Sequence, residues 1–395
     1  MDARKMLLGL GGGIAAGYAL LRTAEALREW CKPSPPRAKD AAAYARIRRA
    51  FELADTTRTT LGFLSFAYGP GARLFDRATR PAPAWMRPAL FFAAFSLLVA
   101  LGDLPAAFVQ EYTLERRFGL SDQSRRNWLG EYAKSALLAA IVTGFLGTLL
   151  GAAVRRAPRR WPWLASLGTF PIFVAANFIV PLYVMPLFNA FQPVKGPLEE
   201  RLRKLAARFG VANASILRMD MSRQTRKANA FVTGIGHTHR SVLGDTLIAA
   251  FPQDETEFVV AHELGHYVNK DTWRTFALGV VLATALFLVA NAAAPERERE
   301  RLRERPLLVA RIYAIMLGAT QVLRPLLLAF SRSREWAADR FALAATGDPA
   351  AGARAFRRLR DQNLADEDPP RWYELFFSSH PSLRARVEAL EATTY

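Results

Sequence analysis

WPWLASLGTFPIFVAANFIVPLYVMPLF (residues 161–188) contains no charged side chain from end to end. A helix that crosses the apolar core of a bilayer needs about 20 predominantly apolar residues. This stretch is long enough, and it carries Trp and Tyr near its ends, as in the aromatic belts of membrane proteins. A helix in a soluble core is rarely apolar on every face over such a length. The stretch therefore predicts a membrane protein.

Four further apolar runs predict additional spans. They comprise residues 88–109, 135–154, 275–294 and 306–330. Charges are few: Asp103 interrupts the first run, and Arg311 and Arg324 lie in the last. Charged residues within spans normally face a bundle interior or water. Together with 51% hydrophobic residues overall, these runs indicate a multi-pass protein.

Two weaker segments leave the number of spans at six or seven. Residues 6–21 follow Ala-Arg-Lys and predict a retained signal anchor; the alternative is a cleaved signal peptide, since Ala-Glu-Ala at 24–26 resembles a cleavage site. Residues 59–68 are short and precede Gly-Pro-Gly, which predicts either a tilted span or a helix in the interface.

The net charge of +18 does not indicate a nucleic-acid-binding protein. The positive charge is concentrated in short loops between apolar runs, such as RRAPRR (residues 155–160), where anionic lipid headgroups are its natural partners. The single Cys31 excludes a disulfide framework within one chain and a thiolate metal cluster. Any bound metal must therefore take nitrogen and oxygen ligands.

The chain divides into two parts. Residues 1–190 form an N-terminal membrane domain with four or five spans, and residues 191–395 form a second domain. The second domain consists of a polar insert, two spans and a C-terminal polar segment, at residues 191–273, about 275–294, 306–330 and 331–395. Within the insert we expect a helix from PLEERLRKLAARFG, a strand from ASILRMDMS, and two short strands or a hairpin from KANAFVTGIGHTHRSVLGDTLIAA.

HELGH (residues 262–266) follows acidic residues that favour a helix N-terminus. On a helix, His262 and His266 lie about 40° apart in angle and about 6 Å apart along the axis, so both imidazoles can reach one ion. Glu263 points about 100° away and suits a general base acting on water. This is the pattern of HExxH zinc hydrolases. A chance occurrence in an amphipathic helix is the alternative.

SREWAAD (residues 333–339) offers the third ligand that catalytic zinc needs. Glu335 and Asp339 are four apart on a predicted helix; one could ligate and the other could accept the outer N–H of a ligating histidine. The alternative is that both pair with nearby arginines, Arg332, Arg334 or Arg340, on a solvated face. His380 precedes a predicted helix start. His237 and His239 predict a tight exposed turn and are assigned no role.

Seven motifs in this order resemble the type I CAAX prenyl proteases, integral membrane zinc metallopeptidases also known as a-factor-converting enzymes. The motifs are LPAAFVQEYTLERRFGLSDQS, VMPLFNAFQPV, KANAFVTGIG, SVLGDTLI, HELGH, SREWAAD and SSHPSLRARVEAL. The resemblance implies a mostly helical polytopic fold, with seven helices around a large intramembrane chamber and a small α/β zinc-metallopeptidase domain. It covers most of the chain after residue 85.

The resemblance also implies roles for individual residues. One Zn2+ per chain would be held by His262, His266 and Glu335, with Glu263 as catalytic base. Asp339 would support a ligand, and His380 and Arg386 would stabilise the oxyanion. Asn229 would align the peptide beside an edge strand. Family members often carry a histidine where this chain has Asp271, which we expect to alter local hydrogen bonding but not metal binding.

The resemblance implies a peptide or protein substrate, including C-terminally prenylated ones, and a bilayer as the surroundings. The Ala- and Arg-rich composition suggests a bacterial inner membrane. Seven spans would place the active site on the cytoplasmic side, although the RRAPRR loop then conflicts with the positive-inside tendency.

Three functional hypotheses follow. The first is a zinc-dependent endopeptidase of the CAAX-processing type. The second is a quality-control protease that clips membrane proteins without needing a prenyl group. The third is a non-catalytic zinc-binding transporter or scaffold, which would show no chelator-sensitive proteolysis.

Overall fold

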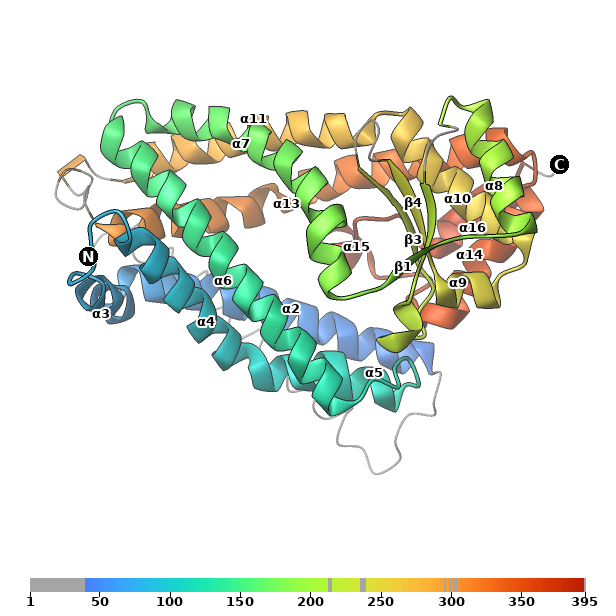
Figure 1. Ribbon diagram of the computed structural model, residues 1–395, viewed down its shortest axis with the longest axis horizontal. Coiled ribbons are helices and arrows are strands. Elements are labelled where there is room, and N and C mark those ends of the chain that lie inside the picture. Colours follow the sequence, from blue (N-terminus) through green and yellow to red (C-terminus); the bar gives the residue numbers. More distant parts are fainter. Residues whose placement is uncertain are drawn as a thin grey trace.

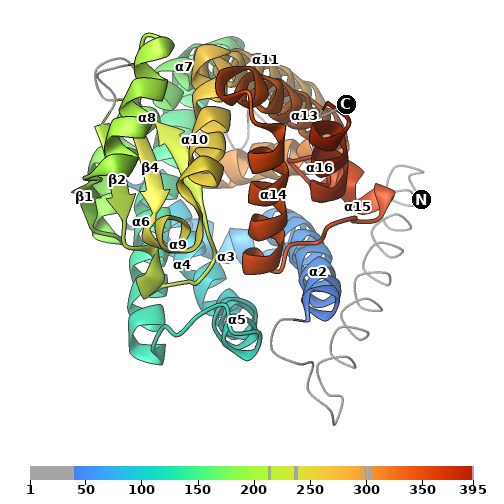
Figure 2. The same ribbon diagram turned by 90° about the vertical axis from the view of Figure 1, so that its right-hand side faces the viewer.

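The computed structural model describes residues 40–211, 215–234, 239–294, 296–297, 300 and 305–393. It is mostly helical, with one small sheet, and this confirms the predicted fold class. Long helices run along the longest axis, and the sheet lies with several shorter helices at one end (Figure 1). Viewed from that end, the elements form a ring (Figure 2).

Five helices of the described residues are long and apolar enough to cross a membrane. They are Arg87–Arg117 (α4, η1 and α5), Arg125–Arg156 (α6), Trp161–Leu187 (α7, η2 and η3), Asp271–Ala293 (α11) and Pro306–Thr346 (α13). These helices coincide with the five strongly apolar runs, two of which extend one residue beyond the end of their helix. The weaker segment 59–68 forms the end of α2 (Ala41–Tyr68), which is not among the five, and residues 6–21 lie outside the described residues.

Small residues let α4 and α6 approach each other closely. A Cβ atom on Gly147 of α6 would lie 2.3 Å from the Cδ2 atom of Phe92 on α4, so only glycine fits there. Close backbone approach of this kind is a common means of packing helices in membranes, where lipid and helix are equally apolar.

Helix α13 joins the membrane part to the polar part without a break. Its 41 residues begin in the apolar run and continue through SREWAAD. The helix ends where Gly347 adopts a left-handed conformation with φ of 66°, which glycine takes without steric cost. The prediction that a helix follows directly from the last span is confirmed.

Four short strands form the sheet in the order β1-β2-β4-β3. They are Phe191–Pro193 (β1), Ser215–Met219 (β2), Ala230–Thr233 (β3) and Arg240–Gly244 (β4). The predicted strand is β2, and the predicted hairpin is the antiparallel pair β3 and β4. Strand β1, antiparallel to β2, was not predicted. Because β3 pairs only with β4, it forms one edge of the sheet.

Helices pack around this sheet to form the core of the polar part. They are α8 (Pro197–Arg208), α9 (Asp245–Ala250), α10 (Gln253–Val268), α14 (Pro349–Asn363) and α16 (Leu383–Glu391). Phe258 and Leu264 of α10 are fully buried in this core together with Leu243 of β4. Burying each such side chain stabilises the fold by roughly 1.5–3 kcal/mol. Helix α10 also packs against α13, where a Cβ atom on Gly265 would lie 3.1 Å from the Cα atom of Ala338. The remaining short elements are α3 (Pro70–Ala78), η4 (Met221–Arg223) and α15 (Arg371–Phe377).

Candidate active site

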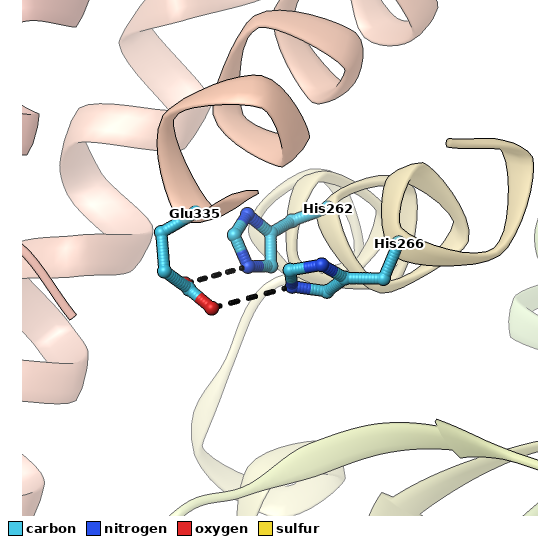
Figure 3. Close-up of side chains that lie close together, drawn as sticks. All are labelled: His262, His266 and Glu335. Carbon is cyan, nitrogen blue, oxygen red and sulfur yellow. Dashed lines mark ion pairs between the residues drawn. The ribbon is translucent and has the colours of Figure 1, made fainter. Parts of the chain in front are cut away.

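Helices α10 and α13 bring His262, His266 and Glu335 together (Figure 3). The Nε2 atom of His262 lies 3.3 Å from Oε2 of Glu335, and Nε2 of His266 lies 3.4 Å from Oε1. Both imidazoles project from the same side of α10, as their spacing predicted, and the carboxylate faces them from the neighbouring helix. These three residues come from segments more than sixty residues apart in the chain.

The three side chains fit a metal ion. Each offers one ligand atom, and the three atoms lie within 4.8 Å of one another. Oε2 of Glu335 is buried and accepts no hydrogen bond among the described residues, although Nε2 of His262 is close to it. A cation between the three would satisfy this oxygen. Two imidazole nitrogens and one carboxylate form a typical ligand set of catalytic zinc.

Asp339 and Arg386 support His262 from behind. Oδ1 of Asp339 lies 2.8 Å from Nδ1 of His262, which leaves Nε2 directed toward Glu335. Arg386 donates from Nε and Nη2 to the two oxygens of Asp339, over 2.8 and 2.6 Å. All three side chains are buried, and the guanidinium carbon lies 4.0 Å from the ring centroid of Phe356. Such outer contacts fix the tautomer and the orientation of a ligating histidine.

The carboxylates around the two histidines favour protonated imidazoles. Burial alone would lower the pKa of His262, but its contacts with Asp339 and Glu335 outweigh burial and raise the pKa to about 9. The pKa of His266 is also raised, because its carboxylate neighbours outweigh its burial. Burial raises the pKa of Glu263, which suits a proton acceptor better than an ordinary surface glutamate. A cation has to displace protons from the two imidazoles to bind there.

Asp271 is a partner of His266 that sequence analysis did not assign. Its Oδ2 atom lies 3.0 Å from Nδ1 of His266, so both histidines contact a carboxylate through Nδ1. Asp271 is buried and begins α11, directly after Lys270, whose φ of 56° makes the sharp turn between the helices. Asp271 lies five residues after His266 in the sequence. The turn that brings its carboxylate next to His266 cannot be deduced from this spacing.

Asp271→Ala should weaken metal binding by roughly 10- to 100-fold, the usual cost of losing a carboxylate that supports a ligating histidine. The histidine would then be free to rotate and to exchange tautomers. Competition with a chromogenic chelator measures the affinity directly. Asp368→Ala, which removes an exposed carboxylate paired with Arg384, should leave the affinity unchanged. Equal affinity in the two variants would contradict the role given to Asp271.

His380 approaches the site from the segment before α16. Its Nε2 atom lies 3.4 Å from Oε1 of Glu335, and Oγ of Ser379 lies 2.8 Å from its Nδ1 atom. The expected helix start is confirmed, since Ser382 caps α16 by accepting a hydrogen bond from the backbone N–H of Ala385.

Arg332 holds this segment in place from α13. It donates from Nη1 to the backbone carbonyls of Glu374 and Ser378, over 2.8 and 2.9 Å. The alternative in which arginines neutralise Glu335 on a solvated face is therefore wrong for Arg332. Glu335 is buried, and its contacts are with histidines and Arg386.

A cavity of about 440 Å³ opens beside these residues. Its lining includes Asn229, His262, Glu263, Glu335, His380 and Arg386. Asn229 is exposed and immediately precedes the edge strand β3. Asn363 bonds both backbone groups of Ala228, accepting from its N–H over 2.8 Å and donating to its carbonyl over 3.0 Å, which steadies the approach to this strand.

Of the two histidines of the predicted exposed turn, His239 is described, and it does not line this site. His237 lies outside the described residues. His239 is buried against Tyr267, with ring centroids 3.9 Å apart, so the expectation that it is exposed was wrong.

Comparisons with known proteins agree with this geometry. A family model described as Peptidase family M48 matches residues 194–394, and one described as CAAX prenyl protease N-terminal, five membrane helices, matches residues 32–190. The fold resembles the crystal structure of S. mikatae Ste24p with a TM-score of 0.80 at 21% identity, covering 99% of each chain.

Two similar curated proteins each match about three quarters of the chain. The "Uncharacterized metalloprotease YhfN" of Bacillus subtilis is 28% identical over 313 residues, covering 76% of this chain and 72% of the relative. "CAAX prenyl protease 1" of Saccharomyces cerevisiae is 26% identical over 332 residues, covering 76% and 71%. The M48 model alone matches more than half of the chain, and the family predicted from the motifs is confirmed. The chain belongs to peptidase family M48, and it is an integral membrane metallopeptidase.

Proposed function

We propose that this protein is a zinc-dependent endopeptidase in which His262, His266 and Glu335 hold one Zn2+. The observation that carries the proposal is the convergence of two imidazoles and one buried, unsatisfied carboxylate oxygen beside Glu263 and an open cavity. When bound, zinc supplies Lewis acidity that polarises a peptide carbonyl and makes water more acidic.

Glu263 is the proposed general base. It lies on α10 between the two histidines and lines the cavity. It takes a proton from the attacking water and returns it to the amine of the departing peptide. His380 and Arg386 line the same cavity, and we assign to them the stabilisation of negative charge on the carbonyl oxygen. Nε and Nη2 of Arg386 are bonded to Asp339, so we assign this role to Nη1, which lies 3.8 Å from Oε2 of Glu335.

The edge strand β3 is the proposed peptide-binding element. An extended peptide can add to a sheet edge through backbone hydrogen bonds, and this would lay it along the cavity beside Glu263. Asn229, exposed at the start of this strand, would align the chain through its side-chain amide.

For the substrate we propose CAAX-type peptides, prenylated near the C-terminus. Support comes from the similarity to proteins named CAAX prenyl protease 1. A quality-control protease without need for a prenyl group is the second candidate. A relative from Nostoc, 34% identical over 187 residues, is named "Protease HtpX homolog", a name that mentions no prenyl group. We further propose a bacterial inner membrane as the location, with the active site on the cytoplasmic side.

The decisive experiment combines zinc quantification with cleavage of a farnesylated CAAX reporter and of its unprenylated counterpart. We expect about one zinc per chain, cleavage that a chelator abolishes, and a preference for the farnesylated peptide. Equal cleavage of both peptides would favour the quality-control function. Metal-independent cleavage, or none with zinc present, would refute the endopeptidase proposal.

Arg332→Gln should reduce kcat by about tenfold, because His380 would no longer be held beside Glu335, while zinc content stays the same. Removing one well-placed donor to a developing oxyanion lowers kcat by about 10²–10³. Loosening such a donor without removing it should therefore lower kcat by a smaller factor. Arg340→Gln provides the control, since Arg340 is exposed on the same helix. Loss of zinc in the Arg332 variant, or unchanged kcat, would argue against the positioning role.

A further inference from the structure

Helix α15 presents two different apolar faces. On one face, Tyr373 and Phe377 line the catalytic cavity. On the other, Trp372, Leu375 and Phe376 are 39%, 43% and 41% exposed. Their i, i+3, i+4 spacing places these three on one side of the helix. A cluster of three large apolar side chains on seven residues is unusual for a surface that faces water, and such patches normally mark an interaction site.

The contacts of α15 fix its level along the membrane helix α13. The guanidinium carbon of Arg324 lies 4.6 Å from the ring centroid of Phe377, and Arg332 bonds the backbone carbonyls at the end of α15. These arginines are eight residues apart, or about 12 Å along the helix axis. The apolar run of α13 ends between them, after residue 330. Helix α15 therefore lies where α13 leaves the apolar layer.

Helix α15 also lies on the outside of the molecule. Figure 2 shows it at the outer edge, beyond α2 and α16. At the same level on α13, Val322 and Leu326 are 78% and 70% exposed, as expected for a span that contacts lipid. They lie about half a turn around the helix from Arg324 and therefore on the side of α13 away from α15. Trp372, Leu375 and Phe376 are therefore exposed at the depth at which α13 leaves the apolar layer. Trp is enriched at this depth because its ring is apolar and its N–H can bond to water or headgroups.

We propose that α15 is an interfacial helix whose Trp372, Leu375 and Phe376 insert into the edge of the bilayer. A second part of the proposal rests on the endopeptidase function proposed above: α15 forms the entry path of the substrate. A lipid-anchored peptide passes over this helix from the bilayer into the catalytic cavity. The cavity face of the same helix leads to His380, three residues beyond Phe377. An anchor held at the outer face would place the attached peptide close to the zinc ligands.

The first test measures depth and does not depend on catalysis. In a Cys31→Ser background, a spin label is placed at Phe376→Cys in phosphatidylglycerol–phosphatidylcholine nanodiscs. We expect the label to be accessible to oxygen and shielded from a water-soluble nickel complex, like a label at Leu326→Cys and unlike one at Lys204→Cys on the exposed face of α8. Preferential access to nickel would refute insertion. Shielding from both reagents would also refute it and would indicate cover by protein, such as the apolar segment 6–21.

The second test measures entry of the substrate. The double variant Trp372→Ser, Phe376→Ser should lower kcat/KM for a farnesylated peptide about tenfold, mainly through KM, and leave the unprenylated peptide unaffected. Leu167→Ser, at an exposed apolar position on α7, is the matched control. An equal loss of kcat/KM for both peptides would show a merely structural effect and would overturn the role of α15 in substrate entry. An unchanged kcat/KM for both peptides would overturn it too. Unchanged zinc content and melting temperature confirm that the variant is folded. If neither peptide is cleaved by the parent protein, the proposed function fails, and the depth measurement still decides whether α15 inserts.

Discussion

Glu263→Gln should abolish peptide cleavage while the protein keeps its zinc. Glutamine preserves the size of the side chain but cannot accept the proton of the attacking water, so the step that depends on a base is lost. Removing a general base typically costs about 10²–10⁴ in rate. We expect a loss at the upper end of this range. Glu263 lines the cavity, and it is the only carboxylate between the two histidines in the sequence of α10.

Metal content and cleavage have to be measured on the same preparation of the Glu263 variant. Zinc determined by elemental analysis should stay near one per chain, because Glu263 contributes no atom to the triad formed by His262, His266 and Glu335. Cleavage of the farnesylated reporter is followed over hours to detect a residual rate. A variant that cleaves at more than about a tenth of the parental rate would exclude Glu263 as the base.

The membrane architecture could be predicted from sequence because the bilayer imposes a local criterion. An apolar run of sufficient length identifies a span wherever its partners lie, and all five strong runs coincide with long helices. The segment 59–68 could not be assigned by this criterion because its apolar run is short. It is the end of α2, whose first half contacts the polar part. Arg49 and Glu52 of α2 bond Asp366 and Tyr373.

Contacts around the site fall into two groups: pairs within one helix, which spacing predicts, and contacts between helices, which it does not. The pairing of His262 with His266 follows from helical spacing, and Glu335 and Asp339 were recognisable as a second pair four residues apart. The bonds from Asp271 to His266 and from Arg332 to the segment before His380 depend on how three helices meet. Spacing within one helix carries no information about such contacts. Glycine-free turns such as that at Lys270 give no composition signal either.

Strand β1 and helix α15 were missed because their sequences are too short to show a period. Residues 191–193 form a strand only through pairing with β2, from Phe191 opposite Met219 to Pro193 opposite Leu217. Residues 364–373 are rich in turn-forming residues, which predicts a connector, and α15 begins within this stretch, at Arg371. The role of the exposed apolar face of α15 can be inferred only when the position of this helix along α13 is known.

Glu335→Gln should release the metal, in contrast to the same substitution at Glu263. The two glutamates border one cavity, yet only Glu335 faces both imidazoles, at 3.3 and 3.4 Å. An amide is a much poorer ligand than a carboxylate and carries no charge to offset the cation. We expect the zinc affinity to fall by more than the roughly 100-fold that loss of an outer partner can cost, with cleavage lost in parallel.

The paired substitutions separate metal binding from proton transfer within one site. Glu388→Gln, exposed on α16, controls for the change of charge and should retain both zinc and activity. Adding excess zinc should restore part of the cleavage by the Glu335 variant, because its Glu263 base is intact, but none by the Glu263 variant. If the Glu335 variant kept its zinc at chelator concentrations that strip the Asp271 variant, Glu335 could not be the third ligand, and the ion would have to be held in another way.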